Sequence, residues 1–222
     1  MSAVIGINGS PRKGWNTHIL VEKALEGAKS EGAEVELVNL YDLSFKGCVS
    51  CFECKRKDGP GYGACAVRDD LRPVLEKIAG CDGLIIGSPI YIGEVTASTR
   101  AFFERLTFQY ITYSRDTRSF FKGQIPTVSI YTMNVPESAL DEIGYSEKFR
   151  FYEERYEHVF GAPSKTLVST ETWQTEDYGK YHMSMFDGGA RKKRREEVFP
   201  KDCEKAFALG AELAGGKNRE AN

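Results

Sequence analysis

Four cysteines gather within one short stretch of this 222-residue chain. The stretch reads GCVSCFECKRKDGPGYGAC over residues 47–65, and its thiols are those of Cys48, Cys51, Cys54 and Cys65. The first three have the spacing C-x2-C-x2-C, which wraps three sulfurs around a compact turn. Glycines and a proline in residues 55–64 allow the chain to fold back and bring in the fourth sulfur. The pattern favours a metal centre or a redox-active thiol site.

Three identities for this centre stay open on the sequence alone. A 4Fe–4S cluster needs four thiolates that converge on one cube. Zinc can use the same four sulfurs, and four reduced thiols on a loop need no metal at all. Lys46, Lys55, Arg56 and Lys57 add positive charge around the sulfurs. That charge offsets an anionic cluster or favours the thiolate form of a free cysteine.

The overall composition excludes several function classes. The formal net charge of −2 gives no global electrostatic case for a nucleic-acid or anionic-membrane partner. We expect no transmembrane helix, because no apolar run reaches about 18 residues. The N-terminal MSAVIGING lacks the basic leader of a signal peptide. We therefore expect a cytoplasmic protein, and in that compartment clustered cysteines are more often metal-binding or redox-active than disulfide-bonded.

Strands that alternate with helices must position these residues. Helical spacing is found at 16–32, 68–81 and 94–108, and a long charged helix closes the chain. Short apolar, β-branched runs predict strands at 2–8, 33–40, 82–89, 125–133 and 164–173. This alternation predicts an α/β fold with a parallel sheet and helices on both of its faces. We assign a single domain over 1–222, with a cysteine-rich loop at 47–65 and an aromatic-rich insertion around 136–190.

Open parallel sheets bind ligands at the carboxyl ends of their strands. The loop after the first strand, NGSPRKGWNTH, ends at the start of a helix whose free N–H groups attract anions. Its side chains Ser10, Arg12, Asn16 and Thr17 add donors and positive charge, which suits a phosphate. The loop is not a Walker A motif. The alternative interpretation is an ordinary polar turn between a strand and a helix.

The loops after the third and fourth strands complete the candidate site. Pro89 and Gly93 bend GSPIYIGEVTA and allow its backbone to approach a ligand, and Tyr91 offers a ring for stacking. Thr132 and Asn134 bring polar groups beside Met133. A flat nucleotide-like ring fits these loops. FMN fits better than a dinucleotide, because the G-x-G-x-x-G fingerprint is absent from the first loop.

The segments INGSPRKGWNT and GSPIYIGEVTAS together resemble the flavodoxin-like NADPH-dependent FMN reductase family. The cysteine stretch followed by AVRDDL resembles the iron–sulfur flavoprotein branch of that family, although the gap between Cys54 and Cys65 is longer than is usual there. The resemblance covers roughly residues 3–135. It implies a flavodoxin-like three-layer sandwich with a five-stranded parallel sheet of order 2-1-3-4-5.

The resemblance also implies a cofactor and its contacts. The FMN phosphate is expected on Ser10, Arg12, Asn16 and Thr17. The edge of the isoalloxazine ring is expected at the backbone of Pro89, Ile90, Tyr91, Ile92 and Gly93. The third loop is expected to contribute Thr132, Met133 and Asn134. The branch resemblance implies a 4Fe–4S cluster on Cys48, Cys51, Cys54 and Cys65.

Two functions follow from these expectations. The first is an enzyme in which FMN passes electrons from NAD(P)H to a quinone, an azo or nitro compound, or another small acceptor. The alternative is an electron-transfer protein with FMN and an iron–sulfur cluster, reduced by a ferredoxin-like partner. No acid or base dyad stands out, and a flavin enzyme needs none because the cofactor carries the chemistry.

Three expectations concern surfaces and distances. We expect a homodimer or homotetramer, with the aromatics of 136–190 covering the flavin or forming a subunit interface. We expect the four cysteines to lie close to a flavin, because their stretch follows the second strand, the neighbour of the first. That flavin belongs to the same chain or to a neighbouring subunit. The run RKKRREE at 191–197 is interpreted as a solvated helix face.

Overall fold

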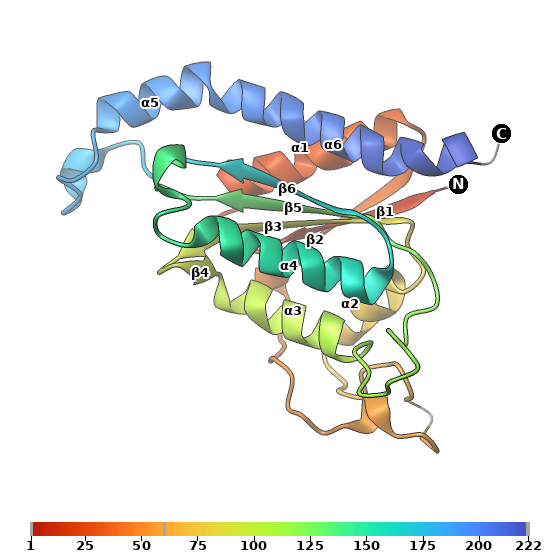
Figure 1. Ribbon diagram of the computed structural model, residues 1–222. Helices are drawn as coiled ribbons and strands as arrows, with labels where there is room; N and C mark the ends of the chain where they lie inside the picture. The colour runs from red at the N-terminus through yellow and green to blue at the C-terminus, as the bar shows by residue number, and fades with distance from the viewer. Residues whose placement is uncertain (1, 60, 221–222) are drawn as a thin grey trace.

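The computed structural model describes residues 2–59 and 61–220, which form one twisted sheet between two layers of helices (Figure 1). Five parallel strands lie in the order β2-β1-β3-β5-β6. Their bounds are β1 Ala3–Asn8, β2 Glu34–Asn39, β3 Gly83–Tyr91, β5 Thr127–Thr132 and β6 Ser164–Ser169. Counted along the chain, these five strands have the predicted order 2-1-3-4-5, so the predicted α/β class and topology are confirmed. A sixth strand, β4, spans Glu94–Val95 and was not predicted.

The helices divide between the two faces of the sheet. Helices α1 (Asn16–Ser30) and α6 (Phe199–Glu220) cover one face. Helices α2 (Leu71–Ile78), α3 (Ala97–Phe108) and α4 (Tyr145–Phe160) cover the other. Short 3-10 turns occur at Leu40–Asp42, Glu53–Lys55, Glu137–Ala139 and Tyr178–Lys180. No helix within the described ranges is long and apolar enough to cross a membrane.

The predicted closing helix is two helices. Helix α5 covers Gly188–Glu197, and α6 begins at Phe199 after a single intervening residue, Val198. Pro200 explains the break, because proline lacks the N–H that would continue the hydrogen-bond ladder of α5 but is well tolerated in the first turn of a new helix. The break places α5 beyond the edge of the sheet toward which the strands point (Figure 1).

Alternate residues of the central strands enter two separate cores. On β1, Ile5 and Ile7 pack with α2, α3 and α4, whereas Val4 packs with α1 and α6. On β3, Ile86 packs with α2, α3 and α4, whereas Ile85 packs with α1 and α6. This division follows from the two-residue period of a strand, and burial on both faces explains why these strands read as continuous apolar runs.

The aromatic stripe of α4 belongs to the first of these cores. Its members are fully or almost fully buried: Phe149, Tyr152, Tyr156, Val159 and Phe160. Tyr131 on β5 stacks on Phe149 with ring centroids 4.3 Å apart. The stripe therefore packs α4 against the sheet and is not a cofactor site. Its burial also raises the pKa of the Tyr152 hydroxyl to about 12.

A short hairpin replaces the first turn of one predicted helix. Helix α3 begins at Ala97, three residues later than predicted, because Glu94 and Val95 pair with Tyr91 and Ile90 at the end of β3. Ile92 and Gly93 close the hairpin, and both have positive φ, at 50° and 77°. A β-branched residue in this conformation is strained, and the side chain of Ile92 is fully exposed.

Gly9 joins the end of β1 to β3 and α3. Its N–H donates to the carbonyl of Gly87 at 2.8 Å, and its carbonyl accepts from Thr96 Oγ1 at 2.7 Å. A Cβ at Gly9 would lie 1.9 Å from Thr99 Oγ1 and 2.9 Å from the Gly87 carbonyl oxygen. Only glycine therefore allows the first loop to leave β1 in contact with the start of α3.

Gly9→Ala should destabilise the protein, because the added methyl group forces this packed junction apart. We expect the free energy of unfolding, measured by denaturant titration, to fall by about 1–3 kcal/mol. Gly80→Ala is the matched control, since its Cβ would meet nothing closer than the Lys77 carbonyl oxygen at 3.8 Å. Equal losses in the two variants would contradict the assignment.

Candidate functional site

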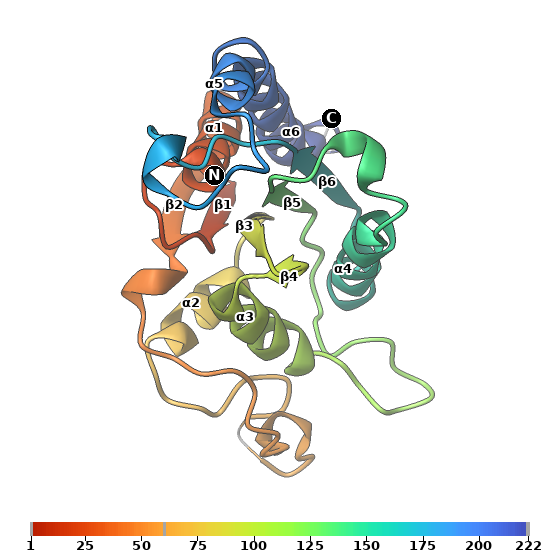
Figure 2. The same cartoon turned by 90° about the vertical axis from the view of Figure 1, so that its left-hand side faces the viewer.

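An open cleft lies at the carboxyl ends of the strands. Its empty volume is about 540 Å³, including the solvent space at its open mouth. Figure 2 views the molecule from this side, with β4 and α5 at the near edge. The residues that line the cleft are Ser10, Arg12, Trp15, Asn16, Thr17, Pro89, Ile90, Tyr91, Thr132, Met133, Asn134, Thr172 and Gln174.

The cleft brings together ten of the twelve residues predicted to contact the cofactor. The other two, Ile92 and Gly93, form the turn of the hairpin and do not line the cleft. The first and third loops are directly linked across the cleft floor, where the hydroxyls of Thr17 and Thr132 lie 2.7 Å apart. Tyr91 stays half-exposed at the rim, and partial burial raises the pKa of its hydroxyl.

The start of α1 presents donors of the kind that bind anions. Within the part of the chain that the structure describes, no side chain caps this helix, so N–H groups of its first turn are free for a ligand. Ser10 Oγ accepts from the Arg12 N–H at 3.1 Å, which leaves its own hydroxyl proton available to a ligand. The helix dipole adds partial positive charge at the same place.

A fourth loop, not predicted from the sequence, closes one side of the cleft. Trp173 lies against Trp15 with ring centroids 5.8 Å apart, and Asn16 Nδ2 donates to the Trp173 carbonyl at 2.8 Å. Arg12 stacks on Trp15 and donates to the Gln174 carbonyl at 2.6 Å. This loop follows β6, so the carboxyl-end rule, applied to the fifth strand as well, would have identified it.

The basic run of α5 is anchored to the cleft, so its interpretation as a solvated face is wrong in part. Lys192 and Lys193 are exposed as expected. Three arginines of the run instead bond to the rim and the end of the sheet. Arg195 Nη1 donates to Asn16 Oδ1 at 2.8 Å, and Arg191 Nη2 donates to the Asn134 carbonyl at 3.2 Å. Arg194 pairs with the buried Asp202 at 2.8 Å.

Buried polar atoms in the cleft fit a polar ligand such as FMN. Both amide atoms of Asn134 and the Oε1 atom of Gln174 are buried without a hydrogen-bond partner among the described residues. Buried polar groups in proteins are nearly always paired, so these atoms are where a ligand rich in hydroxyl and carbonyl groups would bind. With the free N–H groups at the start of α1 and the end of β3 at Pro89–Tyr91, the residues present fit a flavin mononucleotide.

All four clustered cysteines line a second, separate cavity, against the C-terminal half of α3. The other lining residues are Val49, Phe52, Ala66, Val67, Arg105, Phe108 and Gln109. The Cys48 N–H donates to Glu104 Oε2 at 3.3 Å, and the Cys65 N–H donates to Gln109 Oε1 at 2.9 Å. Burial raises the pKa of the Cys54 thiol, which disfavours its thiolate. The chain therefore folds back as expected, so that Cys65 joins the other three.

The four thiols of this cavity are of the chemical type that an iron–sulfur cluster uses as ligands. In residues 2–59 and 61–220, no set of three or more His, Cys, Asp or Glu side chains is arranged to hold a single metal ion. Zinc would need its four sulfurs about 2.3 Å from one point. A cube of iron and sulfide holds its thiolates farther apart, and four thiolates are its usual ligands. Four free cysteines around one cavity fit that requirement.

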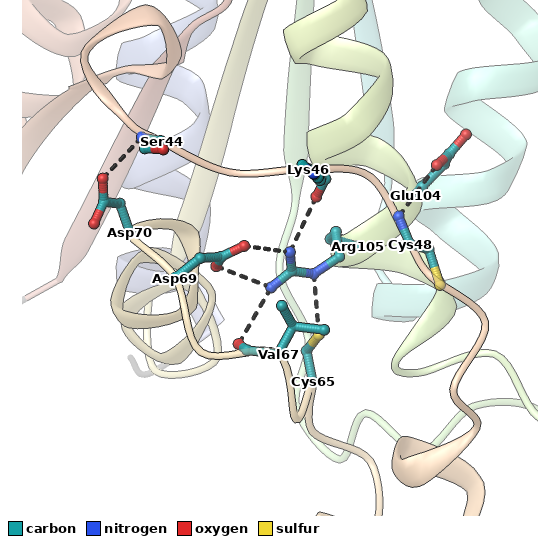
Figure 3. A network of polar contacts seen from close by, with 9 residues as sticks. All are labelled: Ser44, Lys46, Cys48, Cys65, Val67, Asp69, Asp70, Glu104 and Arg105. Atoms are coloured by element: carbon teal, nitrogen blue, oxygen red, sulfur yellow. Dashed lines mark hydrogen bonds and ion pairs between the residues drawn. The ribbon is translucent and has the colours of Figure 1, made fainter.

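Arg105 is the buried charge beside the cysteines (Figure 3). It forms a two-point ion pair with Asp69, with Nη1–Oδ2 at 2.8 Å and Nη2–Oδ1 at 3.2 Å. Burial raises the pKa of the Asp69 carboxyl, but the hydrogen bond and charge of Arg105 outweigh it, so the pKa falls below its usual value. Both groups are therefore charged around neutral pH.

The cysteines do not line the cleft of the same chain, so their closeness to a flavin of that chain stays a prediction. Among the described residues, the cleft and the cysteine cavity share no lining residue. The segment leaves β2 at the expected edge but then passes under α3, and it lies below that helix in Figure 1. Arg105 is eight residues beyond Ala97, about 12 Å along the helix axis. Hydrogen bonds between the segment and Glu104 and Arg105 of α3 hold it there.

The fold and the cleft define an open α/β protein that binds a mononucleotide at the switch point of its sheet. The sequence profile of one such family, described as NADPH-dependent FMN reductase, matches residues 2–125. The chain belongs to this family. The predicted resemblance is thereby confirmed, and FMN is the cofactor that family membership supports.

Known proteins extend the comparison. An iron–sulfur flavoprotein of Methanocaldococcus jannaschii is 40% identical over 102 residues, which are 46% of this chain and 50% of that protein. The chain spans about half the length of the curated relatives it matches. An NAD(P)H:quinone oxidoreductase from Methanothermobacter marburgensis has a TM-score of 0.69 at 17% identity, covering 96% of this chain and 98% of the other. An azoreductase from Bacillus anthracis has a TM-score of 0.66 at 15% identity, covering 96% and 100%. These two structures support the fold.

Arg195→Ala should loosen the fourth loop, because Asn16 then loses the charged donor that holds its amide in place. A hydrogen bond to a charged group contributes about 1.5–3 kcal/mol. We expect backbone amides of residues 172–174 and of α5 to exchange faster with deuterium. Lys192→Ala removes a charge from the exposed side of the same helix and should leave the exchange unchanged. Unchanged exchange in both variants would show that Arg195 does not anchor the loop.

Proposed function

We propose that this protein is an FMN-dependent oxidoreductase that passes electrons from NAD(P)H to a small acceptor such as a quinone, an azo compound or a nitro compound. The observation that carries the proposal is the cleft, where an uncapped helix, the end of β3 and unpaired amides meet at one sheet edge. The family match and the quinone and azo reductases of the same fold support the acceptor class.

The lining of the cleft suits chemistry that the cofactor performs. Among the described lining residues, Arg12 carries the one permanent charge, and none is a carboxylate, a histidine or a cysteine. FMN, when bound, supplies hydride acceptance and electron transfer. The protein groups then bind and orient it. Ser10, Thr17 and the start of α1 hold the phosphate, and the Pro89–Tyr91 backbone faces the ring.

The polar groups of Thr132, Asn134 and Gln174 bind the remaining hydroxyl and carbonyl groups of the cofactor. Met133 and Ile90 provide apolar contact beside them. Trp15 and the loop that contains Trp173 shield the phosphate end from water, because the two rings pack together over that end of the cleft. In this arrangement the open mouth beside Tyr91 is where a nicotinamide or an acceptor reaches the ring.

Replacing Arg12 and Thr17 together with alanine should weaken FMN binding strongly. Each charge-assisted or hydroxyl bond to the phosphate contributes about 1.5–3 kcal/mol. The double variant should therefore bind FMN roughly 10²–10⁴-fold more weakly in a fluorescence titration of the apoprotein. Lys29→Ala, which removes one positive charge from the far end of α1, should leave the affinity unchanged. Unchanged affinity in the double variant would refute the phosphate assignment.

A second candidate is an FMN and iron–sulfur electron-transfer protein that accepts electrons from a ferredoxin-like partner. Two observations favour it. Curated relatives carry the name iron–sulfur flavoprotein, and all four clustered cysteines line one cavity. In this proposal Cys48, Cys51, Cys54 and Cys65 hold a 4Fe–4S cluster. A cytoplasmic location stays a prediction for both candidates.

Anaerobic stopped-flow mixing separates the two candidates. If the protein is the proposed enzyme, NADPH or NADH should bleach the flavin absorbance of the holoprotein within milliseconds to seconds. Reduced ferredoxin serves as the comparison donor. Inertness to both nicotinamides together with fast reduction by ferredoxin would contradict the enzyme and favour the electron carrier.

We further propose that the protein is a homodimer or homotetramer. Exposed apolar side chains surround the cysteine cavity, with Val49, Phe52, Tyr62 and Tyr113 between 48% and 72% exposed. Apolar patches of this kind mark interfaces. A neighbouring subunit seated there would cover these side chains. A solution mass near 24.8 kDa, that of one chain, would contradict this proposal.

A further inference from the structure

Arg105 is the most completely enclosed charged side chain beside the cysteine cavity. Its side chain is 0% exposed, and it comes from the third turn of α3. A buried guanidinium is expensive unless each of its five N–H donors has a partner. The partners here explain its burial, and they all belong to the cysteine segment and its two flanks.

The hydrogen bonds of Arg105 connect the beginning of that segment to its end (Figure 3). Nη1 donates to the Lys46 carbonyl at 3.0 Å, two residues before Cys48. Nε donates to the Cys65 sulfur at 3.0 Å, and Nη2 approaches the Val67 carbonyl at 3.5 Å. Residues almost twenty positions apart in the chain are therefore held by one planar group.

Asp69 fixes the orientation of that planar group. Its two carboxylate oxygens take one N–H from each terminal nitrogen of Arg105. This fork geometry is specific to arginine. Backbone N–H groups at the start of α2 also bond to Asp69. The Nε donor is thereby directed at Cys65, and a lysine could not occupy all of these positions.

The four sulfurs consequently have unequal surroundings. Cys65 receives a donor from a buried cation, whereas the hydrogen bond to Cys48 Sγ within the described residues comes from a backbone N–H, that of Ser50, at 3.4 Å. Cys51 is exposed, and Cys54 interacts with the partly exposed Lys55. Hydrogen bonds to sulfur and local charge both set the potential of an iron–sulfur cluster.

We propose that Arg105, oriented by Asp69, is a positioning residue of the cysteine centre that orders the segment for cluster binding and raises the reduction potential of the cluster through Cys65. The inference rests on the second candidate function, in which these cysteines hold a cluster. It adds to that function two residues outside the cysteine motif, one on α3 and one just before α2. A positive donor at sulfur stabilises the more negative, reduced form, and the Asp69 carboxylate moderates that effect.

The test compares variants after anaerobic reconstitution, using iron and sulfide content and the midpoint potential of the cluster. Arg105→Gln should lower the potential enough to change the reduced-to-oxidised ratio at a fixed potential at least tenfold, about 59 mV for a one-electron couple. Asp69→Asn should shift the potential in the opposite direction, because it removes a negative charge and keeps Arg105. Arg68→Gln removes an exposed positive charge next to Asp69 and should leave the potential unchanged.

The opposite signs distinguish the electrostatic effect of the two charges on the cluster from a loss of structure around it, which would disturb both variants in the same way. Shifts in the same direction, or no shift in iron-loaded Arg105→Gln and Asp69→Asn, would overturn the inference. If Arg105→Gln retains no iron, the sign of the Asp69→Asn shift decides the matter alone. Absence of iron and sulfide from the unaltered protein would overturn the cluster and this inference together, while FMN binding would remain as a separate measurement.

Discussion

The contact between the backbone of Gly9 and the start of α3 is the constraint on which the cleft depends. The first loop leaves β1 at this glycine, which is hydrogen-bonded to Gly87 on β3 and to Thr96 at the N-cap of α3. The phosphate side of the cleft follows from the direction of that loop. The ring side follows from β3 and the hairpin that precedes Thr96. One tightly packed junction therefore sets the relation between the two halves of the cofactor site.

The fold was predictable because its signals are local and repeated. Each central strand is buried on both faces and reads as an apolar run, and helices alternate with the strands along the chain. The boundaries were less predictable where tertiary contacts override local preference. Residues 94–95 have helical neighbours in the sequence but pair with the end of β3. The closing helix is interrupted at Val198, just before Pro200, and its charged and periodic sequence pattern gives no sign of the interruption.

The candidate site was predictable wherever a residue follows a strand directly, as Ser10 and Asn134 do. Sequence reasoning missed contributions from residues distant in the chain. Gln174 reaches the cleft only because β6 lies next to β5, and Arg195 only because α5 extends over the edge of the sheet. The charge run that contains Arg195 resembles a solvated face, since a pattern of charges does not reveal which of them find partners. Arg105 was missed for the same reason, because the sequence of its helix does not reveal that this charged side chain finds partners.

Helix α3 fixes the distance between the cofactor cleft and the cysteine cavity, which share no lining residue among those described. Its first turn, at Thr99, contacts the junction below the cofactor cleft, and its third turn, at Arg105, holds the cysteine segment. Arg105 lies six positions after Thr99. Inserting one residue between them would turn Arg105 by about 100° around the helix axis and move it about 1.5 Å along that axis. The length of this helix, independent of its composition, is therefore under constraint from both of its ends.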